Sequence, residues 1–270
     1  MDNSPKPAKE SEYLSTLERG LSVLRAFDKT HPEMQLSEVA VVTKLSPAVA
    51  RRCLNTLEKL GYVARRGRKF LLRPEVLSFG WSYISSMNLE SVALPYLQAV
   101  RDETGDSSSM AVLSGREVLY VAHVSTQRRI RLSANVGTRF PAHATSLGKV
   151  LLAYQSEETI EAFLSAEPMA RFTEHTITSP DLMRKRLKTV RKNGYDSALD
   201  ELDYGIVSVS VPVFDRERKI ACAINCSTST TRVDLSELVK TRLPLLHEAA
   251  HKIEAALEQT PYVSYSLAGS

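Results

Sequence analysis

The first quarter of the chain contains three segments in which hydrophobic residues recur at helical spacing. Residues 13–29 have one apolar side and one charged side, which predicts an amphipathic helix. The apolar positions of that helix are Leu14, Leu17, Leu21, Leu24 and Phe27. A shorter helix is expected from Leu36, with Ser37 as its capping residue, and a third between Ser46, a good N-cap, and Gly61. We predict that the first helix closes the core beneath the other two.

The pattern changes to short strands after Gly61. Two apolar runs, residues 62–64 and 70–72, flank the basic turn at 65–69, which predicts a β-hairpin. Helix, turn, helix and hairpin in this order are typical of a winged helix-turn-helix DNA-binding domain. Residues 44–73 include nine basic residues and one acidic residue, a net charge of +8, whereas the whole chain carries +4. Because neutralised phosphates release counterions, this charge favours DNA over the alternative of a protein partner for the hairpin.

The helix that follows Ser46 is expected to lie in the major groove of double-stranded operator DNA. Its outward side has small or polar side chains, and we expect base contacts from Ala48, Val49, Arg52 and Asn55. The other residues expected to contact DNA, mostly at phosphates, are Ser46, Arg51, Lys59, Arg65, Arg66, Arg68 and Lys69.

A further helix is predicted from Pro74 to about residue 88, and it is more apolar and aromatic than a solvated linker should be. We expect it to pack against a second copy of the chain, because reading a two-fold operator normally takes a dimer. Burial within one chain is the alternative. The expected organisation is a disordered tail at 1–12, a winged helix-turn-helix domain at 13–73, a linker helix at 74–90, a second domain at 91–260 and a tail at 261–270.

From residue 91 the pattern mixes short strands with helices. Two hairpins are predicted, at 108–113 with 117–124 and at 206–214 with 219–226, and a third strand at 129–136. The predicted helices span residues 92–103, 145–154, 157–164, 180–192 and 235–257. Strands in hairpins with helices between them are typical of an antiparallel sheet in an α+β fold.

Length and composition fit two globular domains. A chain of 270 residues can bury a core in each, and no apolar run approaches the roughly 20 residues that span a bilayer. The polar start does not resemble a signal peptide. Cys53, Cys222 and Cys226 are an odd number in contexts typical of buried positions, which favours reduced thiols. We therefore expect a cytoplasmic protein that has no membrane partner.

Four segments occur in an order that is typical of one bacterial family: LERGLSVLRAF, ARRCLNTLEKLGYV with the basic hairpin, NVGTRFPAHATSLGKVLLA, and ELDYGIVSVSVPVFD followed by ACAINCST. Over about residues 14–257 the chain resembles the IclR family of transcription regulators, and most of all the subgroup with PcaR, PcaU and PobR, which regulate aromatic-acid and β-ketoadipate catabolism. The resemblance implies a winged helix-turn-helix, a linker helix and an effector-binding domain similar to GAF domains. It also implies homodimers that pair into tetramers on the operator, within the nucleoid.

The resemblance further implies where a small organic acid binds. Family members hold such acids between the strands and the start of the helix that follows the HATS sequence. There the backbone N–H groups of Ser146 and Leu147 would attract a carboxylate. The candidate effector-binding residues are Arg129, His143, Thr145, Ser146, Leu147, Ser208, Asn225 and Ser227. Ala198 stands where some glyoxylate-responsive relatives have an acid, so we expect an aromatic or longer acid, such as protocatechuate, 4-hydroxybenzoate or β-ketoadipate. A different small metabolite is the alternative.

Two motifs that occur in enzymes also appear. Residues 247–251, HEAAH, match the HExxH pattern in which two histidines one helical turn apart bind zinc. No third ligand follows at metzincin spacing, and the apolar stripe of the same helix explains it as core, so a zinc hydrolase is the weaker alternative. Residues 146–149 match S-x-x-K but lack its companion motifs. We expect no catalysis, no bound metal and no cofactor.

Overall fold

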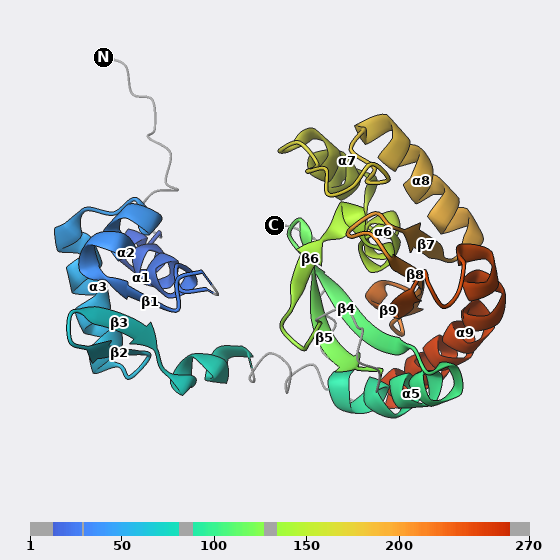
Figure 1. The fold of residues 1–270 in the computed structure, drawn as a ribbon, viewed down its shortest axis with the longest axis horizontal. Coiled ribbons are helices and arrows are strands. Elements are labelled where there is room, and N and C mark those ends of the chain that lie inside the picture. Colours follow the sequence, from blue (N-terminus) through green and yellow to red (C-terminus); the bar gives the residue numbers. More distant parts are fainter. Residues whose placement is uncertain (1–12, 29, 81–88, 127–133, 260–270) are drawn as a thin grey trace, which may run out of the picture. The chain divides into compact units, whose positions relative to one another are not determined.

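A computed structural model describes residues 13–28, 30–80, 89–126 and 134–259, and the chain divides into two compact units, residues 1–82 and 83–270 (Figure 1). The division falls inside the predicted linker helix. That segment begins with η1 (Pro74–Val76) and continues as helix through residues 77–80. The rest of the predicted linker, up to residue 88, lies outside the described residues.

The first unit is a winged helix-turn-helix, as predicted. Its elements are α1 (Ser15–Arg25), β1 (Glu33–Gln35), α2 (Leu36–Thr43), α3 (Pro47–Lys59), β2 (Val63–Arg66) and β3 (Lys69–Leu72). The strands form an antiparallel sheet in the order β1-β3-β2. The sequence pattern did not predict the short strand β1, which pairs with the second strand of the hairpin.

Local capping explains where α2 and α3 begin. The Ser46 side chain accepts a hydrogen bond from the Val49 N–H, as expected for an N-cap, and Pro47 is the first helical residue. The cap of α2 differs from the prediction. Helix α2 already starts at Leu36, and the Glu38 carboxylate accepts a hydrogen bond from the Gln35 N–H at 2.6 Å. Ser37 therefore lies inside the helix and does not cap it.

Only the C-terminal part of the apolar stripe predicted for α1, Leu24 and Phe27, faces the core of this unit. The residues of this region that are buried are Val23, Ala26 and Phe27, whereas Leu14, Leu17 and Leu21 are 69%, 59% and 43% exposed. These buried residues join a core with α2, α3 and the wing strands. The first helix therefore closes the core beneath α2 and α3, as predicted, but only through its C-terminal half. The N-terminal part of the stripe stays exposed, because helical spacing indicates which side of a helix is apolar but not what covers it.

The second unit is built on a six-stranded antiparallel sheet in the order β6-β5-β4-β9-β8-β7. The strands are β4 (Ser107–Ser114), β5 (Glu117–Val124), β6 (Arg139–Pro141), β7 (Asp196–Leu199), β8 (Ile206–Phe214) and β9 (Ile220–Ser229). Both predicted hairpins are present. The third predicted strand was misplaced: residues 134–136 form no strand, and the strand that pairs with β5 is β6. The preceding residues 129–133 lie outside the described part of the chain.

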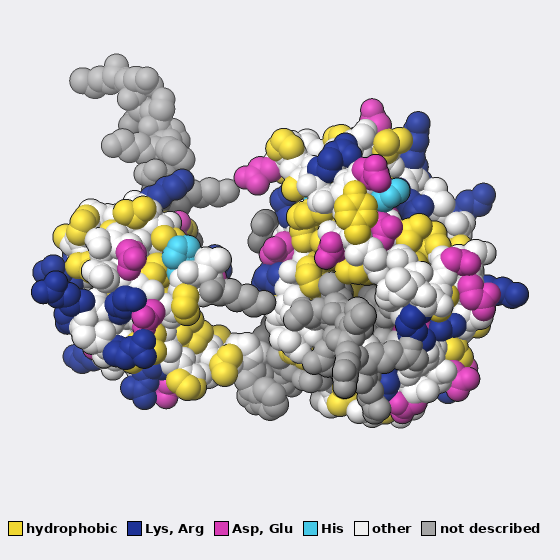
Figure 2. Space-filling model, viewed as in Figure 1, with side chains coloured by type: hydrophobic (Ala, Val, Ile, Leu, Met, Phe, Trp, Pro, Cys, Tyr) yellow, Lys and Arg dark blue, Asp and Glu magenta, His cyan; other side chains and the backbone are white. Residues whose placement is uncertain are grey.

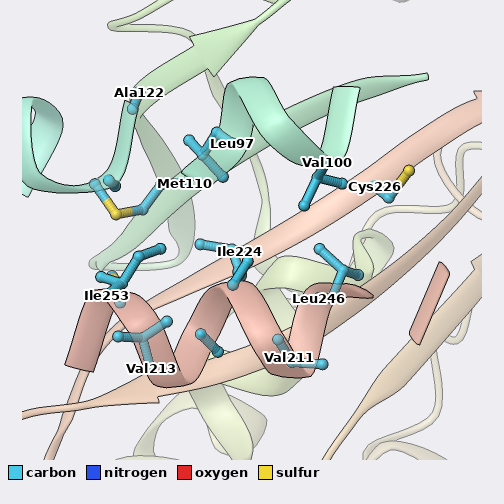
Figure 3. Packing of buried hydrophobic residues seen from close by; sticks show 14 of the residues in the cluster. Leu97, Val100, Met110, Ala122, Val211, Val213, Ile224, Cys226, Leu246 and Ile253 are labelled. Atoms are coloured by element: carbon cyan, nitrogen blue, oxygen red, sulfur yellow. The ribbon is translucent and has the colours of Figure 1, made fainter. Parts of the chain in front are cut away.

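Helices cover both faces of this sheet. On one face α5 (Leu89–Thr104) and α9 (Leu235–Gln259) pack on alternate strand residues, and Figure 3 shows Leu97 of α5 and Leu246 of α9 on either side of Ile224. The other face carries η2 (Ala142–Ala144), α6 (Ser146–Ala153), α7 (Glu157–Ser165) and α8 (Pro180–Asn193). Within β8, the valines at 207, 209 and 211 belong to the α5–α9 core. The serines at 208 and 210 therefore point toward α6.

None of the helices in the described residues is long and apolar enough to cross a membrane. Cys53, Cys222 and Cys226 are buried free thiols, as predicted. Burial raises the pKa of the Cys226 thiol to about 12 and also raises the pKa of Cys222. Both thiols therefore remain protonated and unreactive in the folded protein.

Candidate functional site

The outward side of α3 carries most of the residues predicted to contact bases. Helical spacing places Ala48, Arg52, Asn55 and Lys59 opposite the buried positions, and all four are exposed, as are Ser46 and Arg51. Val49 differs from this group, since it lies at the flank of the helix, is half-buried and packs against the core of the first unit. Figure 2 shows Lys and Arg side chains gathered on one side of this unit.

The wing positions four basic side chains in two different ways. Glu33 of β1 forms ion pairs with Arg66 and, at 2.8 Å, with Lys69, and the hydrogen bond from Lys69 lowers the pKa of the Glu33 carboxyl. Arg65 lies over the Phe70 ring, 5.5 Å from its centroid. Arg68, in the turn between the strands, is exposed and has no ion pair among the described residues. Arg65 and Arg68 are thus the wing cations that no described carboxylate neutralises.

The face of the six-stranded sheet that lies toward α6 carries a line of polar side chains. Strand register pairs Asp196 with Ser210, Ser210 with Asn225, Asn225 with Ser109, and Ser109 with His123. Directly opposed residues point to the same face of a sheet, so these five residues form one continuous row across β7, β8, β9, β4 and β5. We call them the polar row.

A second line of small residues runs beside the polar row. Ala198 is paired with Ser208, Ser208 with Ser227, and Ser227 with Ser107. The Ser107 hydroxyl oxygen accepts a hydrogen bond from the N–H of Thr126 at 3.0 Å. Ser208 and Ser227, both predicted from the family resemblance, therefore lie side by side next to the polar row.

The N-terminus of helix α6 packs against the polar row and the neighbouring line of small residues. The Ser146 hydroxyl oxygen lies 2.8 Å from that of Ser208 and 2.6 Å from that of Ser210. Thr145 is the N-cap, and its side chain accepts a hydrogen bond from the Gly148 N–H at 3.0 Å. The backbone N–H groups of Ser146 and Leu147 have no hydrogen-bond partner within the described part of the chain. Two unpaired donors at the positive end of a helix dipole make this point suited to an anion.

The charged residues beneath α6 pair with one another. Buried Lys149 forms an ion pair with Glu201, and its Nζ lies 3.1 Å from Asp196 Oδ2. Arg186 Nε lies 2.6 Å from Asp196 Oδ1. Burial raises the pKa of the Glu201 carboxyl, and the nearby Lys149 ammonium opposes that rise. Two cations thus balance two carboxylates, so attraction for a ligand anion must come from the helix N–H groups above the cluster.

Three predicted effector-binding residues lie differently from the rest. The His143 Nε2 lies 2.9 Å from the Ala170 carbonyl oxygen, and burial lowers the pKa of the imidazole. His143 therefore holds η2 in place and does not belong to the polar row. The Leu147 side chain is fully buried in the core beneath α6, so only its backbone N–H can face a ligand. Arg129 lies outside the described residues.

Sequence reasoning missed Ser109, His123 and Ser210. The Ser109 hydroxyl lies 2.9 Å from His123 Nδ1, and His123 Nε2 lies 2.9 Å from the hydroxyl of Ser125. Polar residues at alternate positions in β4 and β8 were the available signal. Which of these polar residues lie side by side depends on strand register, and the register pairs residues more than 100 positions apart in the sequence.

The HEAAH segment lies on α9, and its side chains interact with neighbours on the same helix. Glu248, the base in the zinc-hydrolase alternative, pairs with Lys252 at 2.6 Å, and His251 Nδ1 lies 3.4 Å from Glu254. Across the ranges that the structure describes, no three His, Cys, Asp or Glu side chains converge as metal ligands do.

A helix-turn-helix unit with a basic face, followed by an α+β unit, defines the class of transcription regulators with a separate C-terminal domain. The chain belongs to the IclR family: residues 16–67 match the IclR helix-turn-helix domain, and residues 81–255 match the C-terminal domain of bacterial transcriptional regulator IclR. The family predicted from the sequence is therefore confirmed.

Known relatives resemble the chain over most of its length. It is 34% identical to the Pca regulon regulatory protein of Pseudomonas putida, covering 90% of this chain and 84% of that protein. It is 33% identical to the p-hydroxybenzoate hydroxylase transcriptional activator of Acinetobacter baylyi, covering 93% and 94%. A solved IclR homologue from Microbacterium hydrocarbonoxydans, complexed with 4-hydroxybenzoate, has a TM-score of 0.78 and 26% identity, covering 91% of this chain and all of that one. The predicted subgroup is thus confirmed as well.

Proposed function

We propose that this protein binds operator DNA through residues 13–73 and that an aromatic carboxylic acid bound by residues 91–260 controls that binding. The observation that carries the ligand site is the start of α6, where the N–H groups of Ser146 and Leu147 stand unpaired above the polar row. The Pca and p-hydroxybenzoate relatives, and the homologue complexed with 4-hydroxybenzoate, support an aromatic acid as the ligand class.

In this proposal the carboxylate lies at the N-terminus of α6. It accepts hydrogen bonds from the two backbone N–H groups, and the hydroxyls of Ser208 and Ser227 line the adjacent sheet. Thr145 acts indirectly, since capping α6 fixes the direction of its first N–H groups. The ring then extends along the sheet toward Asn225.

On the DNA side, Arg52 and Asn55 are the strongest candidates for base contacts, with Ala48 beside them. Ser46, Arg51 and Lys59 lie on the same exposed side and suit the phosphates that flank the groove. In the wing, Arg65 and Arg68 are the principal phosphate contacts, because Glu33 offsets the charges of Arg66 and Lys69.

We also propose a homodimer that can pair again into a tetramer on the operator. The exposed apolar stripe of α1 supports this, because a helix whose leucines are up to 69% exposed leaves apolar surface uncovered in the single chain. Phe79, 54% exposed, stacks on Tyr62 with ring centroids 5.1 Å apart and continues this apolar surface toward the linker. A second copy would bury both groups.

The test is an electrophoretic mobility shift with DNA that flanks the protein's own gene, at two salt concentrations, with and without aromatic acids. A specific shift that weakens with salt and changes with one acid is the expected result. Specific binding that is indifferent to the whole panel would refute the aromatic ligand, leaving a different small metabolite. No specific shift on this DNA or on randomised sequences would refute operator binding and favour a protein partner for the basic face.

Two substitutions test the roles on the DNA-binding face. Arg52→Ala should cost about 1–3 kcal/mol on the preferred site and relax its sequence preference. Arg68→Ala should weaken all sequences alike and reduce the salt slope by about one. Arg184→Ala is the matched control, because Arg184 lies in the second unit and pairs with Glu161 and Asp181. Equal losses from Arg52→Ala and Arg68→Ala, with unchanged preference, would contradict this assignment.

A further inference from the structure

The three-stranded sheet of the first unit has one face that points away from the core. Phe70 of β3 is 5% exposed and belongs to that core, so its neighbour Lys69 points to the opposite face. Strand register pairs Lys69 with Arg66 of β2 and with Gln35 of β1, and directly opposed residues share a face. Glu33 lies two positions before Gln35 on the same strand, so it shares that face as well. One carboxylate and two cations thus lie together on the outer face of the sheet.

Both oxygens of the Glu33 carboxylate are bound by these cations. Oε1 accepts a hydrogen bond from Lys69 Nζ at 2.8 Å, and Oε2 accepts one from the Arg66 guanidinium. The hydrogen bond from Lys69 lowers the pKa of Glu33, so the carboxylate stays ionised at neutral pH. Arg66 and Lys69 remain open to solvent, with side chains 73% and 44% exposed. Both cations are therefore accessible to DNA but already paired within the protein.

The other two arginines of the hairpin have no such internal partner. Arg68 is exposed without an ion pair among the described residues, and Arg65 lies over the Phe70 ring. A free cation that binds a DNA phosphate releases a counterion from the DNA, and that release drives binding. A cation paired with Glu33 contributes less, because the phosphate must displace a carboxylate of the same sign or lie beside it. The sheet therefore carries two cations that are free to bind phosphates and two that are held back.

We propose that Glu33 is a positioning residue that limits the sequence-independent part of DNA binding. Its carboxylate holds Arg66 and Lys69 in place of two backbone phosphates and leaves Arg65 and Arg68 to contact the DNA. This inference rests on the proposed function, because it requires that the hairpin contacts DNA. Phosphate contacts add affinity to every sequence alike, whereas base contacts discriminate. With two phosphate contacts withheld, the protein depends more on the base contacts of α3.

The experiment measures binding of the full chain by fluorescence anisotropy, over a series of salt concentrations, to the operator duplex and to a duplex of unrelated sequence. Glu33→Gln keeps the size of the side chain and removes its charge. It should bind both duplexes about 3- to 10-fold more tightly at low salt, and the slope of log K against log salt should steepen by about one to two. Its sequence preference should stay unchanged. Surface ion pairs of this kind contribute little to folding, so the variant should fold normally.

Glu58→Gln is the matched control. Glu58 is an exposed acid of α3 with no ion pair in the part of the chain that the structure describes, so the substitution removes the same charge without freeing a cation. It should steepen the salt slope by less than half as much. Arg66→Ala supplies a second comparison. In the wild-type background it should change the slope far less than Arg68→Ala does, whereas in the Glu33→Gln background it should reduce the slope by about one.

The outcomes separate this inference from the proposed function. If the wild-type chain binds neither duplex, both are refuted. If it binds DNA but a folded Glu33→Gln protein has an unchanged slope or binds more weakly, operator binding stands and the limiting role of Glu33 is refuted. Equal steepening by Glu33→Gln and Glu58→Gln also refutes it, since net charge alone then explains the effect. Should Glu33→Gln fail to fold by circular dichroism, equal loss of slope from Arg66→Ala and Arg68→Ala in the wild-type background refutes it, and a much smaller loss from Arg66→Ala supports it.

Discussion

Gly148 allows α6 to pack closely against η2, and Gly148→Ala is the most informative single perturbation of the second unit. A Cβ added at this position would lie 2.1 Å from the Ala142 carbonyl oxygen and 2.4 Å from the Ala142 Cα. Ordinary contact begins at 3.4 Å, so α6 and η2 would have to separate by more than an ångström. Both partners are backbone, and no flexible side chain can move aside to relieve the clash.

The expected cost follows from this geometry. Overpacked cores lose about 1–3 kcal/mol, and a backbone clash belongs at the upper end of that range, about 3 kcal/mol. For a unit the size of residues 83–270 this lowers the melting temperature by about 6–12 °C. Ligand affinity should fall as well, because the movement takes Ser146 away from Ser208 and Ser210.

Differential scanning calorimetry of the full chain measures the effect, and titration with the aromatic acid measures the change in affinity. Gly80→Ala is the matched control, because a Cβ there meets no atom within 4 Å, and its stability should change by no more than about 0.5 kcal/mol. If Gly148→Ala has the same melting temperature as the wild-type protein and binds the acid equally well, the close approach of α6 to η2 does not position this site.

Two further predictions concern the buried charges and the apolar surface. Lys149→Met should destabilise the second unit by about 3–5 kcal/mol, because Glu201 remains buried without its cation while Asp196 keeps only Arg186. The loss of stability should shrink as pH falls from 7 toward 4.5. Burial already raises the pKa of Glu201 in the folded state, and removing the Lys149 ammonium raises that pKa further. The folded variant then binds this proton more tightly than the unfolded chain does, so protonation stabilises it. A loss equal at pH 5 and pH 7 in urea titrations would contradict this. Leu17→Asp on α1 should weaken dimers in sedimentation velocity by at least tenfold, whereas Leu182→Asp on exposed α8 should not; equal sedimentation of both variants would exclude the α1 stripe as the contact.

Much of the first unit could be predicted from local patterns alone. The N-cap at Ser46, Pro47 after it and the glycine at 61, with φ of 86°, set the limits of α3 through interactions within a few residues. The basic hairpin likewise follows from its turn and flanking apolar runs. The cap of α2 was missed because Gln35 is not a typical N-cap residue, and its backbone N–H depends on Glu38 three residues later.

The ligand site was predicted only in part. The family resemblance placed Ser146, Ser208 and Asn225 in it, and the structure brings the first two within 2.8 Å. The family resemblance gave no reason to group Ser109 and His123 with these residues. Nor did it indicate that His143 bonds the Ala170 carbonyl oxygen, since that contact joins segments that are not neighbours in the sequence.

The sequence by itself determined most of the helices and both hairpins, the basic charge of the wing and the family, because periodicity, capping and motif order all act over short stretches of chain. Tertiary structure decided two things that those patterns leave open. Strand register across β7, β8, β9, β4 and β5 assembled the polar row and left the Asn225 oxygen without a donor. The rotation of α1 put Val23 in the core and left Leu17 and Leu21 exposed. Both depend on contacts between distant segments, whose pairing no local pattern specifies.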